Sequence, residues 1–256
     1  MFYNPVIEDH IPMLNDVGRN MFFKKTIQSI VKNKICLDIG AGTGILTDYA
    51  LEFGAKKVYC VEIRKAKAQF LKEKYKGKNV EIIEDNFLNV KIKEVESILM
   101  EITGCQFKNN FIIKSFFQHI KNYYNDAECT ANRYRIKASV FDGIIDQDPT
   151  VLIDSEHLPT GFYENCNQFK TIRETENKYV YDLSKANCFE DIKFELDLEH
   201  YKDATIFLDD EILYNDIICS CESTYRHFPL KPYRINVSEA KKKFVFKWQE
   251  NKFILY

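Results

Sequence analysis

Apolar and polar positions follow two different periods along this chain of 256 residues, and the change falls near residue 130. In the first part, short apolar runs typical of strands alternate with stretches of helical period, after a helical run at residues 20–31. The expected strands cover residues 34–39, 57–62, 80–84 and 97–101, and the expected helices cover residues 44–53, 64–75 and 110–124. This alternation predicts a parallel, Rossmann-like sheet with right-handed helical crossovers.

Beyond residue 130, apolar residues recur at every second position. The clearest runs are residues 134–140, 191–198 and 243–248, and Gly, Pro, Asn and Asp residues separate them. Residues 249–252 are typical of a hairpin turn. The pattern predicts a second, all-β unit that buries one of its faces.

The turn after the first expected strand is rich in glycine. Gly40-Ala41-Gly42-Thr43-Gly44 lies between an apolar strand and a helix that stops at Gly54. Such a turn brings backbone N–H groups and the positive end of a helix to one point, and glycine lets the main chain approach a ligand closely. Glu62 ends the second strand, 22 residues after Gly40, where nucleotide-binding folds carry the acid that binds a ribose diol. Together these features predict a nucleoside-containing ligand.

The spacing of the glycines distinguishes between nucleoside ligands. The turn reads Gly-x-Gly-x-Gly rather than the Gly-x-Gly-x-x-Gly of dinucleotide folds, and Ile45 and Leu46 follow without the lysine or serine of a phosphate loop. The segment from Leu37 to Leu46 resembles the cofactor motif of S-adenosylmethionine-dependent methyltransferases, and a nicotinamide enzyme is the alternative. The resemblance implies S-adenosyl-L-methionine as the cofactor, held by Asp38, Gly40, Gly42, Gly44, Ile45 and Glu62.

The residues before Asn20 extend the resemblance to one family. His10-Ile-Pro-Met13-Leu14-Asn-Asp16-Val-Gly-Arg19 is similar to the His-x-x-Met-Leu-x-Asp-x-x-Arg helix of the protein arginine methyltransferases. The resemblance implies that this helix closes over the cofactor, that His10 and Met13 line the lid, and that Arg19 pairs with the methionine carboxylate. A guanidinium fork suits a carboxylate. Without the resemblance, Arg19 would be interpreted as an ordinary surface residue.

The family resemblance also implies a domain organisation. Asn132-Arg133 resembles the family's entry into a β-barrel. We expect an α/β domain at residues 1–132, with the lid helix and a Rossmann-like methyltransferase sheet carrying helices on both faces. Residues 133–256 are then a smaller, all-β, barrel-like domain that binds the substrate. A homodimer is implied by the resemblance alone, because residues 167–187 show no clear helix of the kind that forms the family's dimerisation arm.

The expected acceptor site departs from the family pattern. The family holds the arginine acceptor between two glutamates nine residues apart, and the match here is Glu101 and Asn110. An asparagine brings no charge, and its amide donors would face a guanidinium that can only donate. Pro232 and Tyr233 stand where the family has a histidine and a tryptophan, and His227 is interpreted as a surface residue rather than a substitute.

The adenine contacts are expected after the third strand. The resemblance places Phe87 where an apolar residue brackets the adenine ring. The acid expected to bind the adenine amine falls on Leu88, which leaves Asn86 as the polar partner.

Composition excludes several classes of protein. The formal net charge of −2 argues against a protein whose main task is to bind nucleic-acid phosphates, and the lysines between residues 56 and 78 are interpreted as a solvated helix face. Cys36 and Cys60 fall in expected buried strands, and the pair Cys219-x-Cys221 has no second pair at zinc spacing, so no metal site is expected. No apolar run of 18 residues and no leader is present, so we expect a soluble cytoplasmic protein without a membrane partner.

Three functions stay open on the sequence. The first is methyl transfer to arginine side chains of protein substrates. The second is a methyltransferase that acts on another protein side chain or a small amine, since the loss of one carboxylate suits a less cationic acceptor. The third is a scaffold protein that binds the cofactor without transferring methyl. The sequence identifies neither the acceptor nor the number of methyl groups transferred.

Overall fold

A computed structural model describes most of the first half of the chain and the strands of the second half. The described residues are 10–101, 110–142, 171–174, 178–183, 193–197, 203–215, 217–219, 233–238, 243–247 and 252–255. The chain divides into two compact units, and the first comprises Met1–Thr103, Phe111–Asn132 and Leu213–Ser223. The segment Leu213–Ser223 therefore groups with the first unit, although it lies within the second expected domain.

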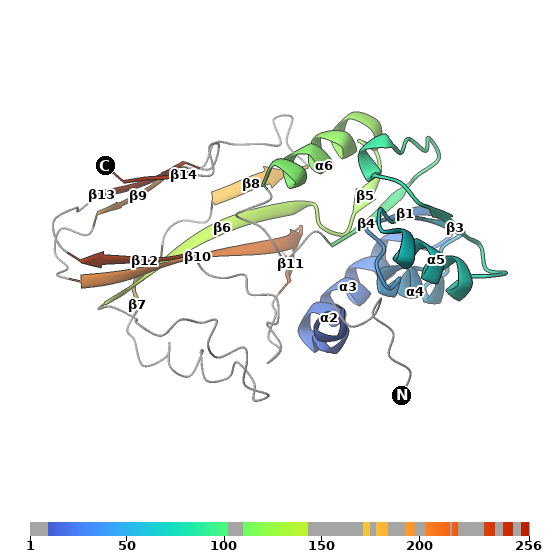
Figure 1. The fold of residues 1–256 in the computed structure, drawn as a ribbon, viewed down its shortest axis with the longest axis horizontal. Coiled ribbons are helices and arrows are strands. Elements are labelled where there is room, and N and C mark those ends of the chain that lie inside the picture. The colour runs from blue at the N-terminus through green and yellow to red at the C-terminus, as the bar shows by residue number, and fades with distance from the viewer. Residues whose placement is uncertain are drawn as a thin grey trace. The chain divides into compact units, whose positions relative to one another are not determined.

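The first unit contains one parallel sheet of five strands. These strands are β1 (Ile35–Ile39), β2 (Lys57–Val61), β3 (Val80–Ile83), β4 (Ser97–Met100) and β5 (Glu128–Cys129). Their order is β3-β2-β1-β4-β5, and every neighbouring pair is parallel (Figure 1). The strand order reverses direction between β1 and β4, and open α/β sheets bind ligands at the carboxyl ends of the strands beside such a switch point. The predicted Rossmann-like sheet is confirmed.

Helices connect the strands of this sheet. They are α2 (Ile11–Asn15), α3 (Val17–Ile30), α4 (Ile45–Glu52), α5 (Lys65–Lys74), the short 3-10 helix η1 (Phe87–Asn89) and α6 (Asn110–Tyr123). Helix α3 begins three residues earlier than the expected run, because Asp16 caps it by accepting a hydrogen bond from the backbone N–H of Arg19 at 2.9 Å. Helix α4 begins at Ile45, and its N-cap residue Gly44 has a positive φ and no side chain to cap the helix.

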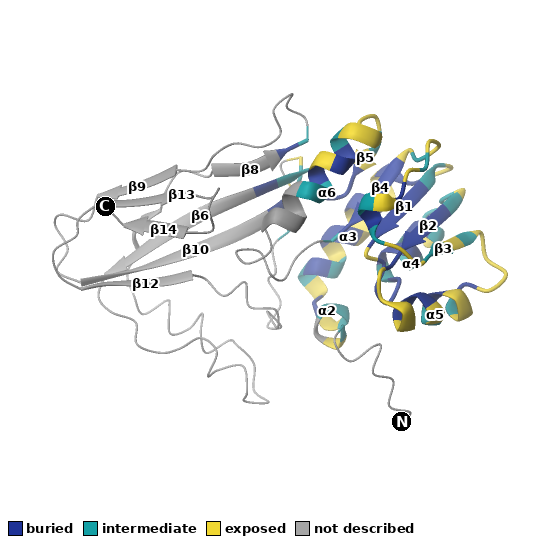
Figure 2. Cartoon of the chain, turned by 45° about the horizontal axis from the view of Figure 1, so that its top comes forward, coloured by how far each residue is buried: buried dark blue, intermediate teal, exposed yellow. Residues whose placement is uncertain are grey.

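Apolar side chains from the strands form the core of the first unit (Figure 2). Leu37, Ile98 and Leu99 are fully buried, and so are the cysteines Cys36 and Cys60. Burial raises the pKa of the Cys36 thiol to about 12, and it raises that of Cys60 as well. Both thiols are free, which confirms their interpretation as small core residues.

The second unit consists of strands in its described part. One sheet contains β6 (Arg133–Asp142), β7 (Thr171–Glu174), β8 (Lys178–Asp182), β10 (Asp203–Tyr214) and β12 (Tyr233–Ser238). The short strand β11 (Ile217–Ile218) pairs with the last two residues of β10, and these residues group with the first unit. A second sheet contains β9 (Lys193–Asp197), β13 (Lys243–Lys247) and β14 (Lys252–Leu255). Strands β13 and β14 pair antiparallel with Lys247 opposite Lys252, which confirms the expected hairpin. Closure of these strands into a barrel stays a prediction.

Two negative findings apply to the described residues. No helix among them combines the length and apolar character needed to cross a membrane. Within the same part of the chain, no cluster of three or more His, Cys, Asp or Glu side chains could hold a metal ion.

Candidate functional site

The glycine turn follows β1 at the carboxyl edge of the sheet. Gly40, Gly42 and Gly44 have φ values of 68°, 57° and 79°, in the left-handed region that favours glycine. The backbone N–H of Gly40 and that of Ala41 both donate to the carbonyl oxygen of Val61, at 2.9 and 3.1 Å. These bonds hold the turn against the end of β2.

Glu62 lies directly after β2 and is tied to this turn. Its Oε2 accepts a hydrogen bond from the backbone N–H of Gly42 at 2.9 Å, and its Oε1 accepts one from that of Arg64 at 2.8 Å. Only 5% of Glu62 is exposed. A carboxylate offers about four lone-pair positions, so two remain for further donors. The structure thus brings the expected ribose acid and the expected glycine turn into one site.

Thr43 supplies a further polar atom to the turn. Its hydroxyl oxygen is buried and has no hydrogen-bond partner in the described part of the chain. A buried hydroxyl without a partner costs free energy, which a ligand that bonds to it would recover. Together with the remaining lone pairs of Glu62, this orphaned group fits a polar ligand such as a nucleoside.

The lid residues lie beside the turn. The ring of His10 covers Gly42 so closely that a Cβ atom at residue 42 would be 2.6 Å from His10 Cε1. The Nε2 atom of His10 also contacts the Nζ atom of Lys67 in α5. Met13, in α2, is partly exposed and accepts a hydrogen bond at its carbonyl oxygen from Arg19 Nη1 at 3.3 Å. His10 of the predicted lid therefore lies against Gly42 of the predicted cofactor turn.

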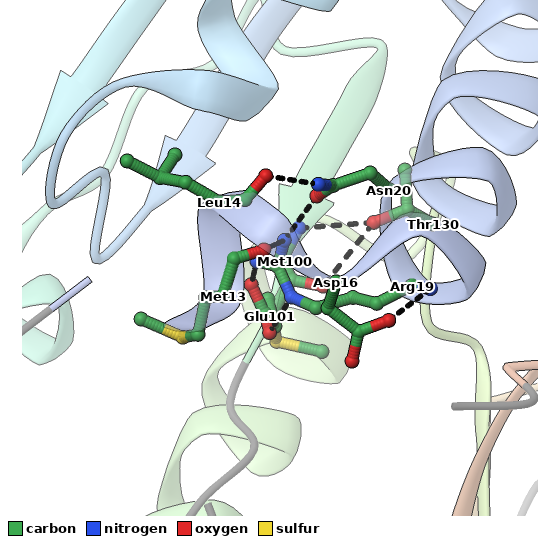
Figure 3. Close-up of polar contacts among 8 residues, drawn as sticks. All are labelled: Met13, Leu14, Asp16, Arg19, Asn20, Met100, Glu101 and Thr130. Atoms are coloured by element: carbon green, nitrogen blue, oxygen red, sulfur yellow. Dashed lines mark hydrogen bonds and ion pairs between the residues drawn. The ribbon is translucent and has the colours of Figure 1, made fainter. Parts of the chain in front are cut away.

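Arg19 and Glu101 form a buried ion pair at the carboxyl end of β4 (Figure 3). The Nε and Nη2 atoms of Arg19 donate to the two carboxylate oxygens of Glu101, in the paired geometry that makes such bonds strong. Nη1 donates to Asn20 Oδ1 at 2.6 Å, and the guanidinium lies 5.2 Å from the ring centroid of Phe23. Only 6% of Arg19 is exposed. The interpretation of Arg19 as a surface residue is therefore excluded.

Thr130 fixes the backbone that leads into Glu101, a role that the sequence pattern did not predict. The backbone N–H of Met100 donates to Thr130 Oγ1 at 3.0 Å, and that hydroxyl donates to the carbonyl oxygen of Met100 at 3.3 Å (Figure 3). Thr130 is completely buried. The only signal in the sequence was a hydroxyl residue after the short strand β5, which is too weak to find it.

The residues that follow β3 pack against α6 and cap η1. Phe87 is only 3% exposed and packs against Phe116, His119 and Tyr124, with ring centroids 4.8 to 6.1 Å apart. Its proposed contact with adenine stays a prediction. Asn86 caps η1, since its Oδ1 accepts from the backbone N–H of Leu88 at 3.0 Å.

Asp85 is a carboxylate that the sequence analysis did not select. It is exposed two residues beyond the end of β3, and its Oδ1 accepts hydrogen bonds from Asn86 N at 2.6 Å and Asn89 Nδ2 at 2.9 Å. Its position after the third strand was the available signal.

Some expected site residues lie partly or wholly outside the described residues. Asn110 begins α6, but its side chain is among those not described. Pro232 and His227 lie outside the described residues, and Tyr233 begins β12.

Comparisons with known proteins agree on the fold and differ on the acceptor. A family model for ribosomal RNA adenine dimethylase matches residues 20–124. Ribosomal RNA small subunit methyltransferase A of Mesomycoplasma hyopneumoniae is 36% identical over 101 residues, which are 38% of this chain and 38% of that protein. Protein arginine N-methyltransferase 9 of Xenopus laevis is 47% identical over 58 residues, 22% of this chain and 7% of that protein. The matches thus span well under half of these relatives.

Solved structures match over almost the whole chain. The PRMT1 enzyme-prozyme heterotetrameric complex of Trypanosoma brucei with AdoHcy has a TM-score of 0.64 at 14% identity, covering 94% of this chain and 87% of that chain. Protein arginine methyltransferase 10 of Arabidopsis thaliana has a TM-score of 0.57 at 15% identity, covering 96% and 95%. The chain has a class I methyltransferase fold and resembles the protein arginine methyltransferases. The comparisons also support S-adenosyl-L-methionine as the cofactor.

Asp38 lies beneath the turn of this methyltransferase fold, away from solvent. Its Oδ2 accepts a hydrogen bond from Thr47 Oγ1 at 2.6 Å, and the same hydroxyl lies 3.0 Å from Cys60 Sγ. Burial raises the pKa of Asp38 to about 7, although its hydrogen bonds to Thr47 oppose the shift, and the negative charges of Glu62 and Asp48 add to it. Through Thr47 the Asp38 side chain links β1 to α4, and its direct contact with a ligand stays a prediction.

The first prediction concerns the pH dependence of stability. The pKa of Asp38 is higher in the folded protein than the ordinary value of 3.8, so the unfolded chain releases this proton first. Asp38 therefore makes its full contribution to the free energy of unfolding below about pH 4. As the pH rises from about 4 to about 7, this contribution falls by on the order of 3–4 kcal/mol. Asp38→Asn keeps an acceptor for Thr47 without ionising.

Urea unfolding of the wild type and of Asp38→Asn at pH 4.5 to 8 measures this effect. As the pH rises across this interval, the free energy of unfolding of the wild type should fall relative to that of the variant. Two parallel curves would contradict the assignment of a buried, titrating Asp38.

Proposed function

We propose that this protein transfers a methyl group from S-adenosylmethionine to arginine side chains of protein substrates. The observation that carries the proposal is the buried pair of Arg19 and Glu101 beside the glycine turn. It unites, at one edge of the sheet, the arginine expected to bind the cofactor and the carboxylate expected to bind the acceptor. Likeness in fold to the arginine methyltransferases supports the same function.

The turn and its neighbours provide groups for the cofactor. Glu62 has lone pairs for the ribose hydroxyls, Thr43 has an unused hydroxyl, and Arg19 has a guanidinium for the methionine carboxylate. Asp85 and Asn86 follow β3 on the side where we place the adenine. Bound there, S-adenosylmethionine would supply an electrophilic methyl group on a sulfonium.

Glu101 is the group proposed to orient the acceptor. A guanidinium has a pKa above about 12, so no side chain of the site would simply deprotonate it. A preorganised carboxylate instead binds the cation and holds one nitrogen in line with the methyl group. Arg19 and the backbone contacts of Thr130 fix the position of that carboxylate.

Asn110 and the ribosomal family model support a second candidate, an amine of RNA as the acceptor. An adenine amine is neutral, and a site with one carboxylate is less unfavourable for a neutral acceptor than a site with two. The described lysines argue the other way: Lys57, Lys72 and Lys74 each pair with a carboxylate, namely Glu81, Glu84 and Asp48. These pairs leave a weaker positive field for phosphates than the lysine count alone indicates.

Assembly and location complete the proposal. The trypanosome neighbour is a heterotetrameric complex, and its assembly supports the homodimer that we propose for this chain. We also propose that the substrate is a protein and that the chain is located in the cytoplasm.

The second prediction tests the ribose site. Glu62→Gln places an amide against the backbone N–H groups of Gly42 and Arg64 and removes the charge that would accept from ribose. Affinity for AdoHcy, measured by calorimetry, should fall by about 1–3 kcal/mol. Glu81→Gln is the matched control, because Glu81 is an exposed acid of the neighbouring strand that bonds to Lys57. If both variants bind AdoHcy as tightly as the wild type does, Glu62 does not bind the ribose.

The third prediction separates Arg19 as a ligand of the cofactor from Arg19 as a lid support. Arg19→Lys keeps the charge but loses the fork, so AdoHcy affinity should fall about tenfold while adenosine, which lacks the carboxylate, binds nearly unchanged. Arg133→Lys, at an arginine that pairs with Asp182, should change neither affinity. A parallel loss of adenosine binding would show that the lid has lost its structure and would contradict the carboxylate assignment.

The fourth prediction tests the acceptor class. Glu101→Gln keeps the shape of the side chain but removes its charge, so methylation of arginine peptides should fall about 100-fold, as when one preorganised electrostatic group is lost. Asn110→Glu adds the carboxylate found in the family pair and should increase peptide methylation. Transfer of labelled methyl to peptides and to structured RNA is measured side by side. Labelling of RNA alone would overturn the arginine proposal in favour of the second candidate.

A further inference from the structure

Three side chains connect helix α5 and helix α4 to the glycine turn. Tyr75, the residue that ends α5, places its hydroxyl 2.7 Å from the carbonyl oxygen of Gly44 and 2.9 Å from Asp48 Oδ1. Lys74 Nζ donates to the carbonyl oxygen of Thr43 at 2.8 Å and to Asp48 Oδ2 at 2.6 Å. We call Asp48, Lys74 and Tyr75 the turn clamp. It binds two successive carbonyl groups of the turn.

The turn clamp explains why residue 44 is glycine. A Cβ atom at residue 44 would lie 2.3 Å from the Tyr75 hydroxyl, and the φ of 79° is itself unfavourable for other residues. Tyr75 is only 2% exposed, so its hydroxyl has little room to move aside. The last residue of the motif must therefore be glycine, because Tyr75 occupies the space that a Cβ atom would need.

The charges of the clamp keep the Tyr75 hydroxyl a donor. Burial and the neighbouring carboxylate of Asp48 raise the pKa of Tyr75 far above its ordinary value, so the phenol stays protonated. Its proton is shared between the carbonyl oxygen of Gly44 and Asp48, while Lys74 compensates the charge of Asp48.

We propose that Tyr75, supported by Lys74 and Asp48, is a positioning residue for cofactor binding. Because the peptide unit is planar, fixing the carbonyl groups of Thr43 and Gly44 also fixes the N–H groups that follow them. Three glycines with positive φ give the turn many other conformations, and a clamp that selects one of them lowers the cost of ordering it on binding. This inference rests on the proposed function, since it assigns a role in the same cofactor site.

The experiment compares Tyr75→Phe with Tyr59→Phe in the full chain. Tyr59 is also a largely buried tyrosine whose hydroxyl has two partners, Glu94 and Lys57, but it reaches no atom of the turn in the described contacts. Both variants lose one hydroxyl and should lose similar thermal stability. Only Tyr75→Phe should bind AdoHcy about tenfold more weakly, and only in Tyr75→Phe should the backbone N–H groups of Gly44 and Ile45 exchange with solvent faster.

A second pair of variants applies if Tyr75→Phe does not fold. Lys74→Met removes the donor to Thr43, and Lys72→Met is its control on the same helix, where Lys72 bonds to Glu84 instead. A selective loss of AdoHcy affinity in Lys74→Met supports the proposal, and equal affinities of the two variants overturn it.

The outcomes separate this inference from the proposed function. If the wild type binds no AdoHcy, the proposed function fails, and the cofactor role of Tyr75 fails with it. If the wild type binds AdoHcy and Tyr75→Phe binds it equally well, only the positioning role of Tyr75 is overturned.

Discussion

The buried ion pair between Arg19 and Glu101 holds the candidate site together. It joins α3, which follows the lid, to the end of β4 in the middle of the sheet. Removing two charges from water is costly, and the pair compensates this only because its remaining groups are bonded. Asn20 and the carbonyl group of Met13 accept from the guanidinium, and the ring of Phe23 lies beside it. Truncation of either partner would leave the charge of the other without its compensation.

In the proposed function, the same pair sets the charge that an acceptor meets. With Arg19 bonded to it, the carboxylate of Glu101 is locally neutralised, so its attraction for a cation depends on how much of Arg19 another carboxylate engages. A ligand that carries its own carboxylate would compete for the guanidinium and leave Glu101 more negative. Binding of the carboxylate-bearing ligand and binding of the cation are thus coupled. This coupling matters more where asparagine replaces the second glutamate than in a site with two acids.

The sequence predicted the elements that local pattern determines. Strands β1 to β4 lie within a residue or two of their expected positions, because each is a short, mainly apolar run. Strand β5 was missed because two residues carry no periodic signal, and the start of α3 was misplaced because Asp16 was not interpreted as its cap. The burial of Phe87 against α6 could not be predicted, because an apolar residue in a loop gives no information about which partner it contacts.

The parts of the site that the sequence could not supply are contacts between residues far apart along the chain. Glu62 was found because its distance from the glycines follows from the length of one strand-helix-strand unit. Tyr75 and Thr130 were not found, since they reach Gly44 and Met100 across about 30 residues from places that no motif marks. At Gly44 and Met100 each bonds to the backbone, so neither needs a particular residue type at the position it supports, except that Gly44 must lack a Cβ. That requirement is how Tyr75 affects the motif. The third glycine is needed both for the positive φ of the turn and for the room that the Tyr75 side chain takes beside it.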